Sequence, residues 1–156
     1  MVPDGTEVIG NSEYSGEDYK RIFIPKSVLQ IGDYAFDGCK NLKEVVIEEG
    51  SKLKTIEMDA FQNCNSLVRI NLPEGLEKIG IFSFWETGLE NIEFSASLRT
   101  IAYGAFAKCK SLRTVKFNEG LEVIGTDEYT DKGGMWYGVF GECFGKSRTT
   151  FHAEEN

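Results

Sequence analysis

Four cysteines are the residues whose type could carry redox chemistry or bind a metal. Each lies three residues after a phenylalanine, and the spacings between them are 25, 45 and 34 residues. They are Cys39, Cys64, Cys109 and Cys143. Zinc ligands usually come as close pairs such as C-x-x-C, and a disulfide framework would not follow so regular an arrangement. Because free cysteine packs as a small apolar side chain, we expect buried structural thiols, with disulfides and a metal site as the alternatives.

The single histidine and the carboxylates do not form a recognisable catalytic arrangement. His152 lies in the C-terminal tail, where packing seldom holds a side chain as a Ser-His-Asp or Cys-His site requires. The carboxylates recur at predicted turns, where solvated acids are expected. Examples are Glu48, Glu49, Glu74 and Glu119. The glycines of "GVFGECFG" follow no predicted strand and open no helix, so they do not predict a phosphate loop. We expect no catalytic residue, no metal and no cofactor.

Length, composition and charge limit the classes of partner. The chain has 156 residues, of which 41% are hydrophobic, and this is enough for one domain with a substantial core. Its net charge of −8 repels phosphate backbones and anionic lipid surfaces. No apolar run approaches the roughly 18 residues of a membrane-spanning helix, and no signal peptide is recognisable. We expect a single domain over residues 1–156 that binds no nucleic acid and does not insert into a membrane.

A nine-residue frame recurs four times and positions the cysteines. Its copies are "IGDYAFDGC" at 31–39, "IEMDAFQNC" at 56–64, "IGIFSFWET" at 79–87 and "IAYGAFAKC" at 101–109. The anchor phenylalanines are separated by 25, 23 and 22 residues, which indicates an internal repeat. Five and eight residues before each anchor stand aliphatic residues, which are predicted core positions. They are Ile31, Ile56, Ile79 and Ile101, and Val28, Leu53, Leu76 and Leu98.

A short alternating run follows each frame and predicts a strand. The runs are "VVI" at 45–47, "INL" at 70–72, "IEF" at 92–94 and "VKF" at 115–117, and "IFIP" at 22–25 precedes them. The frame is then expected to return the chain along the opposite side as a single helical turn. A unit of about 23 residues cannot bury its apolar residues alone, so neighbouring units must stack. We therefore predict a repeat solenoid.

The predicted repeats begin near residues 22, 45, 70, 92 and 115, after a partial repeat over 1–21. The last repeat carries an insert at 126–137, and "VFGEC" restores the frame at Phe140. The run "TTF" at 149–151 is a candidate last strand. Because the chain starts and stops inside repeats without an obvious polar cap, we expect a fragment of a longer protein, or ends that meet another copy.

The succession "NLPEGLEKIG", the recurrent "AFxxC" and the following "C-K-x-L" resemble the BspA-like leucine-rich repeat family. The resemblance implies a curved solenoid with short parallel strands on the concave face and short helical or irregular turns on the convex face. It also implies bacterial or protist origin, secretion or cell-surface display, and a role in adhesion or protein binding. The insert in the fifth unit and three substitutions are departures from the family pattern that mark where this copy is specialised. Thr87 replaces a frame cysteine, and Glu57 and Ala102 replace the usual glycine.

Three surfaces are candidates for binding a protein. The first is the outward row on the predicted sheet, for which a merely solvated sheet face is the alternative. It consists of Phe23, Val46, Asn71, Glu93 and Lys116. The second is the region of Ile81, Phe82 and Trp85 on the opposite side. This region, like the repeat ends, could join two copies of the chain, or it packs partly inward.

The insert is the third candidate. Tyr129, Trp136 and Tyr137 are of types enriched at binding hot spots, and inserts in repeat arrays often lie on the functional face. The alternative is a lid in which these aromatic side chains cover the end of the core. A calcium site from Asp127, Glu128 and Asp131 would lack a full set of oxygen ligands.

Together these patterns favour a noncatalytic protein-interaction module, with bacterial cell-surface or secreted adhesion as the role that the resemblance implies. The partner is an unidentified protein. A structural spacer or oligomerising segment of a larger protein is the first alternative. An accessory domain of an enzyme is the second.

Overall fold

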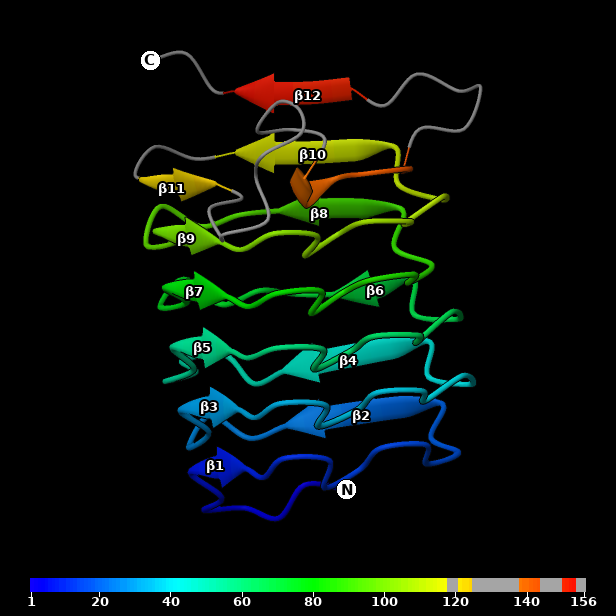
Figure 1. Cartoon of the computed structure of the whole chain (residues 1–156). Coiled ribbons are helices and arrows are strands. Elements are labelled where there is room, and N and C mark those ends of the chain that lie inside the picture. The colour runs from blue at the N-terminus through cyan, green and yellow to red at the C-terminus, as the bar shows by residue number, and fades with distance from the viewer. Residues whose placement is uncertain (118–120, 125–137, 144–149, 154–156) are drawn as a thin grey trace.

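Short parallel strands stack turn upon turn into a solenoid (Figure 1). The computed structural model describes residues 1–117, 121–124, 138–143 and 150–153. The predicted repeat solenoid is confirmed, and each predicted core position lies in a continuous hydrophobic core. Because every turn contacts the turns before and after it, the array buries side chains that one unit would leave exposed.

The predicted alternating runs form one column of strands, which is divided into two three-stranded parallel sheets. The first sheet contains β2 (Arg21–Ile24), β4 (Glu44–Ile47) and β6 (Arg69–Ile70). The second contains β8 (Asn91–Glu93), β10 (Thr114–Phe117) and β12 (Thr150–Ala153). Alternate side chains point into the core, as the burial of Ile22 and Ile24 beside the exposed Phe23 illustrates. The candidate last strand is thus present as β12, which includes His152.

A second column of strands was not predicted. Its six members form one uninterrupted parallel sheet. They are β1 (Val8–Ile9), β3 (Gln30–Ile31), β5 (Thr55–Ile56), β7 (Lys78–Ile79), β9 (Thr100–Ile101) and β11 (Val123–Ile124). The predicted core isoleucines Ile31, Ile56, Ile79 and Ile101 are the second residues of four of these strands and are fully buried. The frame therefore begins with a strand.

The rest of the frame forms irregular turns instead of the predicted helical turn. The N–H of Phe36 donates to the carbonyl of Ala60 at 2.8 Å, and the N–H of Phe61 donates to that of Ser83 at 2.7 Å. These bonds join successive turns of the solenoid, so the N–H groups are not available to the i−4 carbonyls of a helix. Tyr34 also has a φ of 56°, in the left-handed region, which interrupts a right-handed helix.

The anchor residues form an aromatic stack through the core. Tyr14, Phe36, Phe61, Phe84, Phe106 and Phe140 follow one another with nearly parallel rings. The ring centroid of Phe61 lies 5.1 Å from that of Phe36 and 5.3 Å from that of Phe84. These separations are typical of favourable offset stacking. The constant position of the anchor in the sequence is explained by this stack.

The four cysteines are free and buried beside the stack. The thiol of Cys64 donates to the carbonyl of Phe36, that of Cys109 to Phe84 and that of Cys143 to Phe106. Hydrogen bonding to Cys39, together with burial, raises the pKa of the Cys64 thiol above its usual range. Each of these thiols therefore donates a hydrogen bond to a carbonyl of the preceding turn and fills a small apolar space, as expected for structural cysteines.

Asp59 is a buried carboxyl in the second frame, and only 4% of its surface is exposed. Burial raises its pKa above the value of an exposed aspartate, and the side-chain amide of Gln62 donates to it. The carboxyl group of Asp59 therefore binds its proton more tightly in the folded chain than in the unfolded chain. The contribution of Asp59 to stability is fully present below the unfolded pKa of about 4 and is lost as the pH rises through the folded pKa.

Replacing Asp59 by asparagine is expected to remove this pH-dependent loss. The difference in unfolding free energy between Asp59→Asn and the parent should shift in favour of the variant as the pH rises from about 4 through the acid range. Urea unfolding at several pH values measures that difference. Parallel pH profiles for the two proteins would contradict the assignment.

Candidate functional site

Outward side chains of the first column of strands lie on one side of the solenoid. We call it the strand face and define it by Phe23, Val46, Asn71, Glu93 and Lys116. The parallel register places Phe23 beside Val46 and Glu93 beside Lys116. The predicted row therefore exists as two neighbouring pairs with Asn71 between them.

The N-terminal half of the strand face is partly apolar. Phe23 is 40% exposed, and Val46 beside it is half-buried. Arg21 Nε lies 3.0 Å from Glu44 Oε2 on the flank of this pair. An exposed aromatic ring next to an aliphatic side chain and an ion pair has the mixed character of a protein-binding surface.

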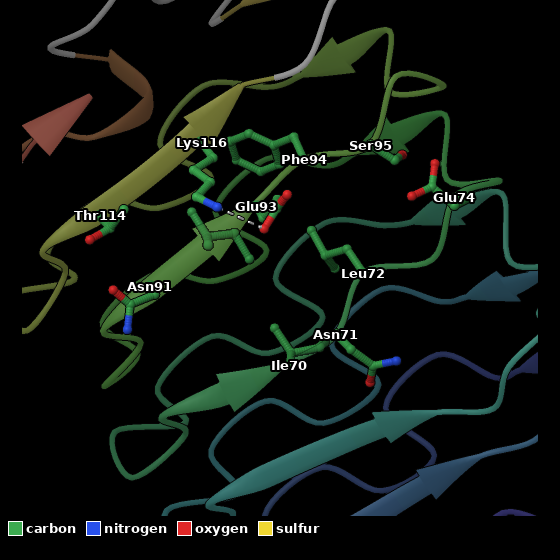
Figure 2. A pocket seen from close by; sticks show the side chains of 11 residues that line it. Ile70, Asn71, Leu72, Glu74, Asn91, Glu93, Phe94, Ser95, Thr114 and Lys116 are labelled. Atoms are coloured by element: carbon green, nitrogen blue, oxygen red, sulfur yellow. Dashed lines mark ion pairs between the residues drawn. The ribbon is translucent and has the colours of Figure 1, made fainter. Parts of the chain in front are cut away.

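The C-terminal half of the strand face is charged. Lys116 Nζ lies 3.6 Å from Glu93 Oε2, and both side chains are substantially exposed. Figure 2 shows this ion pair across β8 and β10, with Asn91 and Thr114 on the same two strands. An exposed pair of this kind contributes little to stability, about 0–1 kcal/mol. Its charges thus remain accessible to a partner.

Asn71 has a structural role that sequence reasoning missed. Its side-chain oxygen accepts from the N–H of Ile47 at 2.9 Å, and its side-chain nitrogen donates to the carbonyl of Ile47 at 2.9 Å. The amide thus takes the place of a neighbouring main chain along β4. The polar atoms of Asn71 are used within the fold, although the residue is exposed. The signal in the sequence that could have indicated this role is that asparagine occurs only once in the row.

A groove divides the strand face between β6 and β8. These strands belong to different sheets, whereas β7 and β9 of the second column pair normally across the same two turns. The groove has a volume of about 490 Å³ and combines apolar and polar side chains (Figure 2). Its lining includes Ile70, Leu72, Glu74, Asn91, Glu93 and Phe94. The predicted row is therefore interrupted by a recess.

The second predicted region lies on the turns of the opposite side. Ile81, Phe82 and Trp85 are each half-buried, so the region is neither fully exposed nor fully packed. The rings of Phe82 and Trp85 are 4.8 Å apart, and Lys108 Nζ lies 4.8 Å from the centroid of the Trp85 ring. The buried indole N–H of Trp85 has no hydrogen-bond partner among the described residues. Phe82, Trp85 and Lys108 line a recess of about 300 Å³, whereas Ile81 does not.

The third candidate lies outside the described residues. It comprises Tyr129, Trp136 and Tyr137, together with the acids considered for calcium. Across the part of the chain that is described, no group of His, Cys, Asp and Glu side chains is arranged to hold a metal ion. In the same ranges, no helix has the length and apolar character needed to span a bilayer.

Comparisons with known proteins agree with this architecture. The family model for the BspA type leucine-rich repeat region matches residues 7–133 in six copies. No curated protein matches the chain.

Several solved structures are similar to the chain, and two of them share about 30% of its sequence over the matched region. A leucine-rich repeat protein of T. pallidum (TpLRR) is 30% identical with a TM-score of 0.66, and the match covers 76% of this chain and 61% of that protein. The pneumococcal vaccine antigen PcpA is 29% identical with a TM-score of 0.72, and the match covers 87% of this chain and 31% of the antigen. The chain therefore spans less than two thirds of either protein.

Proposed function

We propose that this chain, which belongs to the BspA type leucine-rich repeat family, is a noncatalytic module that binds a protein partner through its strand face. The observation that carries the proposal is the row of outward side chains that successive turns present on one side. This row combines the exposed ring of Phe23 with the accessible charges of Glu93 and Lys116. A repeated array can present many such side chains to one partner at once.

The setting that we propose is the surface of a bacterial cell or the medium outside it, with adhesion as the role. The similarity to PcpA, a pneumococcal vaccine antigen, supports this setting. The net charge of −8 disfavours nucleic acid as the partner. A partner with a complementary basic and apolar surface fits the strand face best.

An oligomerising segment is the second candidate function. The half-buried aromatic side chains of Phe82 and Trp85 favour it, because a second copy could cover them and the recess beside them. Sedimentation of the purified chain tests this candidate. A concentration-dependent dimer that Trp85→Ala abolishes would support it, and a monomer at all concentrations would exclude it.

The strand-face proposal is tested by affinity capture followed by a paired comparison of variants. A binding protein is captured from host and bacterial extracts, identified, purified and then tested against Phe23→Ala and Leu29→Ala. Phe23 and Leu29 are exposed to nearly the same extent, 40% and 39%, but Leu29 precedes β3 in the second column. We expect Phe23→Ala to weaken binding and Leu29→Ala to leave it unchanged.

A further inference from the structure

The main-chain pairing of the strand face is interrupted between β6 and β8, which lie in successive turns (Figure 1) and belong to different sheets. On either side of this interruption, β6 pairs with β4 and β8 pairs with β10. The second column continues without interruption, since Lys78 and Ile79 pair with Thr100 and Ile101. The interruption is therefore a local opening in one face of an otherwise continuous solenoid.

The opening leaves one edge of β8 without a strand partner. The N–H of Phe94 donates to the carbonyl of Lys116 at 3.0 Å, so Phe94 directs its main chain toward β10. Alternate residues of a strand direct their main-chain groups to opposite edges. The N–H and carbonyl groups of Asn91 and Glu93 thus face β6, and no described residue pairs with them. An unpaired edge of this kind is a template for an additional strand.

The sequence around β6 keeps the opening in place. The side chain of Asn71 is held against β4 by its two hydrogen bonds to Ile47. Pro73 follows two residues later and has no N–H to donate. Strand β6 therefore ends at Ile70 after only two residues. The groove of about 490 Å³ lies where a longer β6 would have paired with β8.

The lining of the groove indicates the chemistry of a ligand. Ile70 and Leu72 are half-buried on one side, and Phe94 is buried on the other. Two carboxylates belong to the lining, and only that of Glu93 has a cation beside it. The carboxylate of Glu74 has no ionic partner among the described residues, and the residue is exposed. A basic side chain complements these carboxylates, and it also complements the net charge of the chain, which is −8.

We propose that the groove binds an extended peptide segment of the protein partner. The main chain of this segment pairs with Asn91 and Glu93 along β8, and an arginine or lysine side chain of the segment reaches Glu74. The inference rests on the proposed function and specifies what part of a partner the strand face recognises. Main-chain hydrogen bonds supply affinity in this mode of recognition, and the basic side chain supplies selectivity.

Amide shifts in the complete chain test the position and chemistry of this site. The probes are two pools of synthetic seven-residue peptides without proline, one with arginine fixed at the centre and one with glutamate there. A third pool carries the central arginine and N-methyl groups at the flanking peptide bonds. We expect the arginine pool to shift the amide signals of Asn91 and Glu93 in nuclear magnetic resonance spectra. The glutamate and N-methylated pools should bind at least about tenfold more weakly, a difference of about 1.4 kcal/mol.

Paired variants test the role of Glu74. Glu74 and Glu49 each precede the glycine of a turn, in adjacent repeats, but only Glu74 lines the groove. We expect Glu74→Gln to weaken binding of the arginine pool about fivefold and Glu49→Gln to leave it unchanged. Shifts confined to residues outside the groove, or equal affinity for the methylated pool, would overturn the inference. If either result is obtained while Phe23→Ala still weakens binding of the captured partner, only the peptide site is contradicted. If Phe23→Ala has no effect, the proposed function itself fails.

Discussion

Replacing Phe61 by alanine is expected to lower the free energy of unfolding by about 3–5 kcal/mol, the usual range for a buried phenylalanine. Phe61 is fully buried and lies in the middle of the aromatic stack, between Phe36 and Phe84. Removing its ring leaves a cavity in contact with the rings of both neighbouring turns. Because a repeat array is stabilised mainly by contacts between adjacent units, this cavity weakens two interfaces together.

Urea unfolding followed by circular dichroism measures this loss. Phe23→Ala serves as the matched control, since its ring is 40% exposed and its removal should change the stability by no more than about 0.5 kcal/mol. Phe61→Leu, which keeps most of the volume, should cost less than about 1.5 kcal/mol. A loss below about 1 kcal/mol for Phe61→Ala would contradict the stacked core.

The second large effect is expected for Gly104→Ala, at about 2–4 kcal/mol. Two causes add. Gly104 has a φ of +64°, a left-handed conformation that costs alanine about 1–2 kcal/mol. A Cβ atom at this position would also lie 2.2 Å from Cε1 of the Phe82 ring, which is much closer than van der Waals contact allows. The Phe82 ring contacts the rings of Trp85 and Tyr103, so a displacement of Phe82 would disturb both contacts.

A double-mutant cycle separates the two causes. In a Phe82→Ala background the steric conflict is absent, so Gly104→Ala should cost only the backbone contribution of about 1–2 kcal/mol. Unfolding free energies of the parent, the two single variants and the double variant give the coupling. An equal cost of Gly104→Ala in both backgrounds would show that Phe82 does not fill the space above the glycine.

The repeat architecture was predictable because its signal recurs in register. The anchor phenylalanines and the frame isoleucines repeat at nearly constant spacing, and stacking is the only way that such short units bury them. The burial of Phe36 and Ile31 follows directly from this pattern. The strands of the first column were also predictable, since the alternation in "VVI" or "VKF" sends successive side chains to opposite sides.

The second column of strands had no comparable signal. Each of its strands has two residues, such as Gln30 and Ile31, which is too short for an alternating pattern. Its pairing depends on main-chain hydrogen bonds to the preceding and following turns. The same dependence explains why the frame does not form a helical turn. Local propensity gives no information about such bonds between distant residues.

The groove on the strand face was not predicted. At the position of Asn71 the other turns have Phe23, Val46, Glu93 or Lys116. Asparagine alone among these carries both a donor and an acceptor that can replace a main chain. The row was therefore predicted as a set of contact residues, whereas the side chain of Asn71 pairs with the main chain of Ile47 in β4.

The dissociation constant of the captured partner, measured in parallel for the parent chain, Phe23→Ala and Leu29→Ala, tests the central claim that a protein binds through the strand face. Phe23 is the exposed aromatic side chain of that face, and truncating an aromatic side chain that is a binding hot spot costs about 2 kcal/mol or more. We expect Phe23→Ala to raise the dissociation constant by a factor of about 30 and Leu29→Ala to change it by less than about twofold. Equal constants for all three proteins, or a larger loss for Leu29→Ala, would contradict the account.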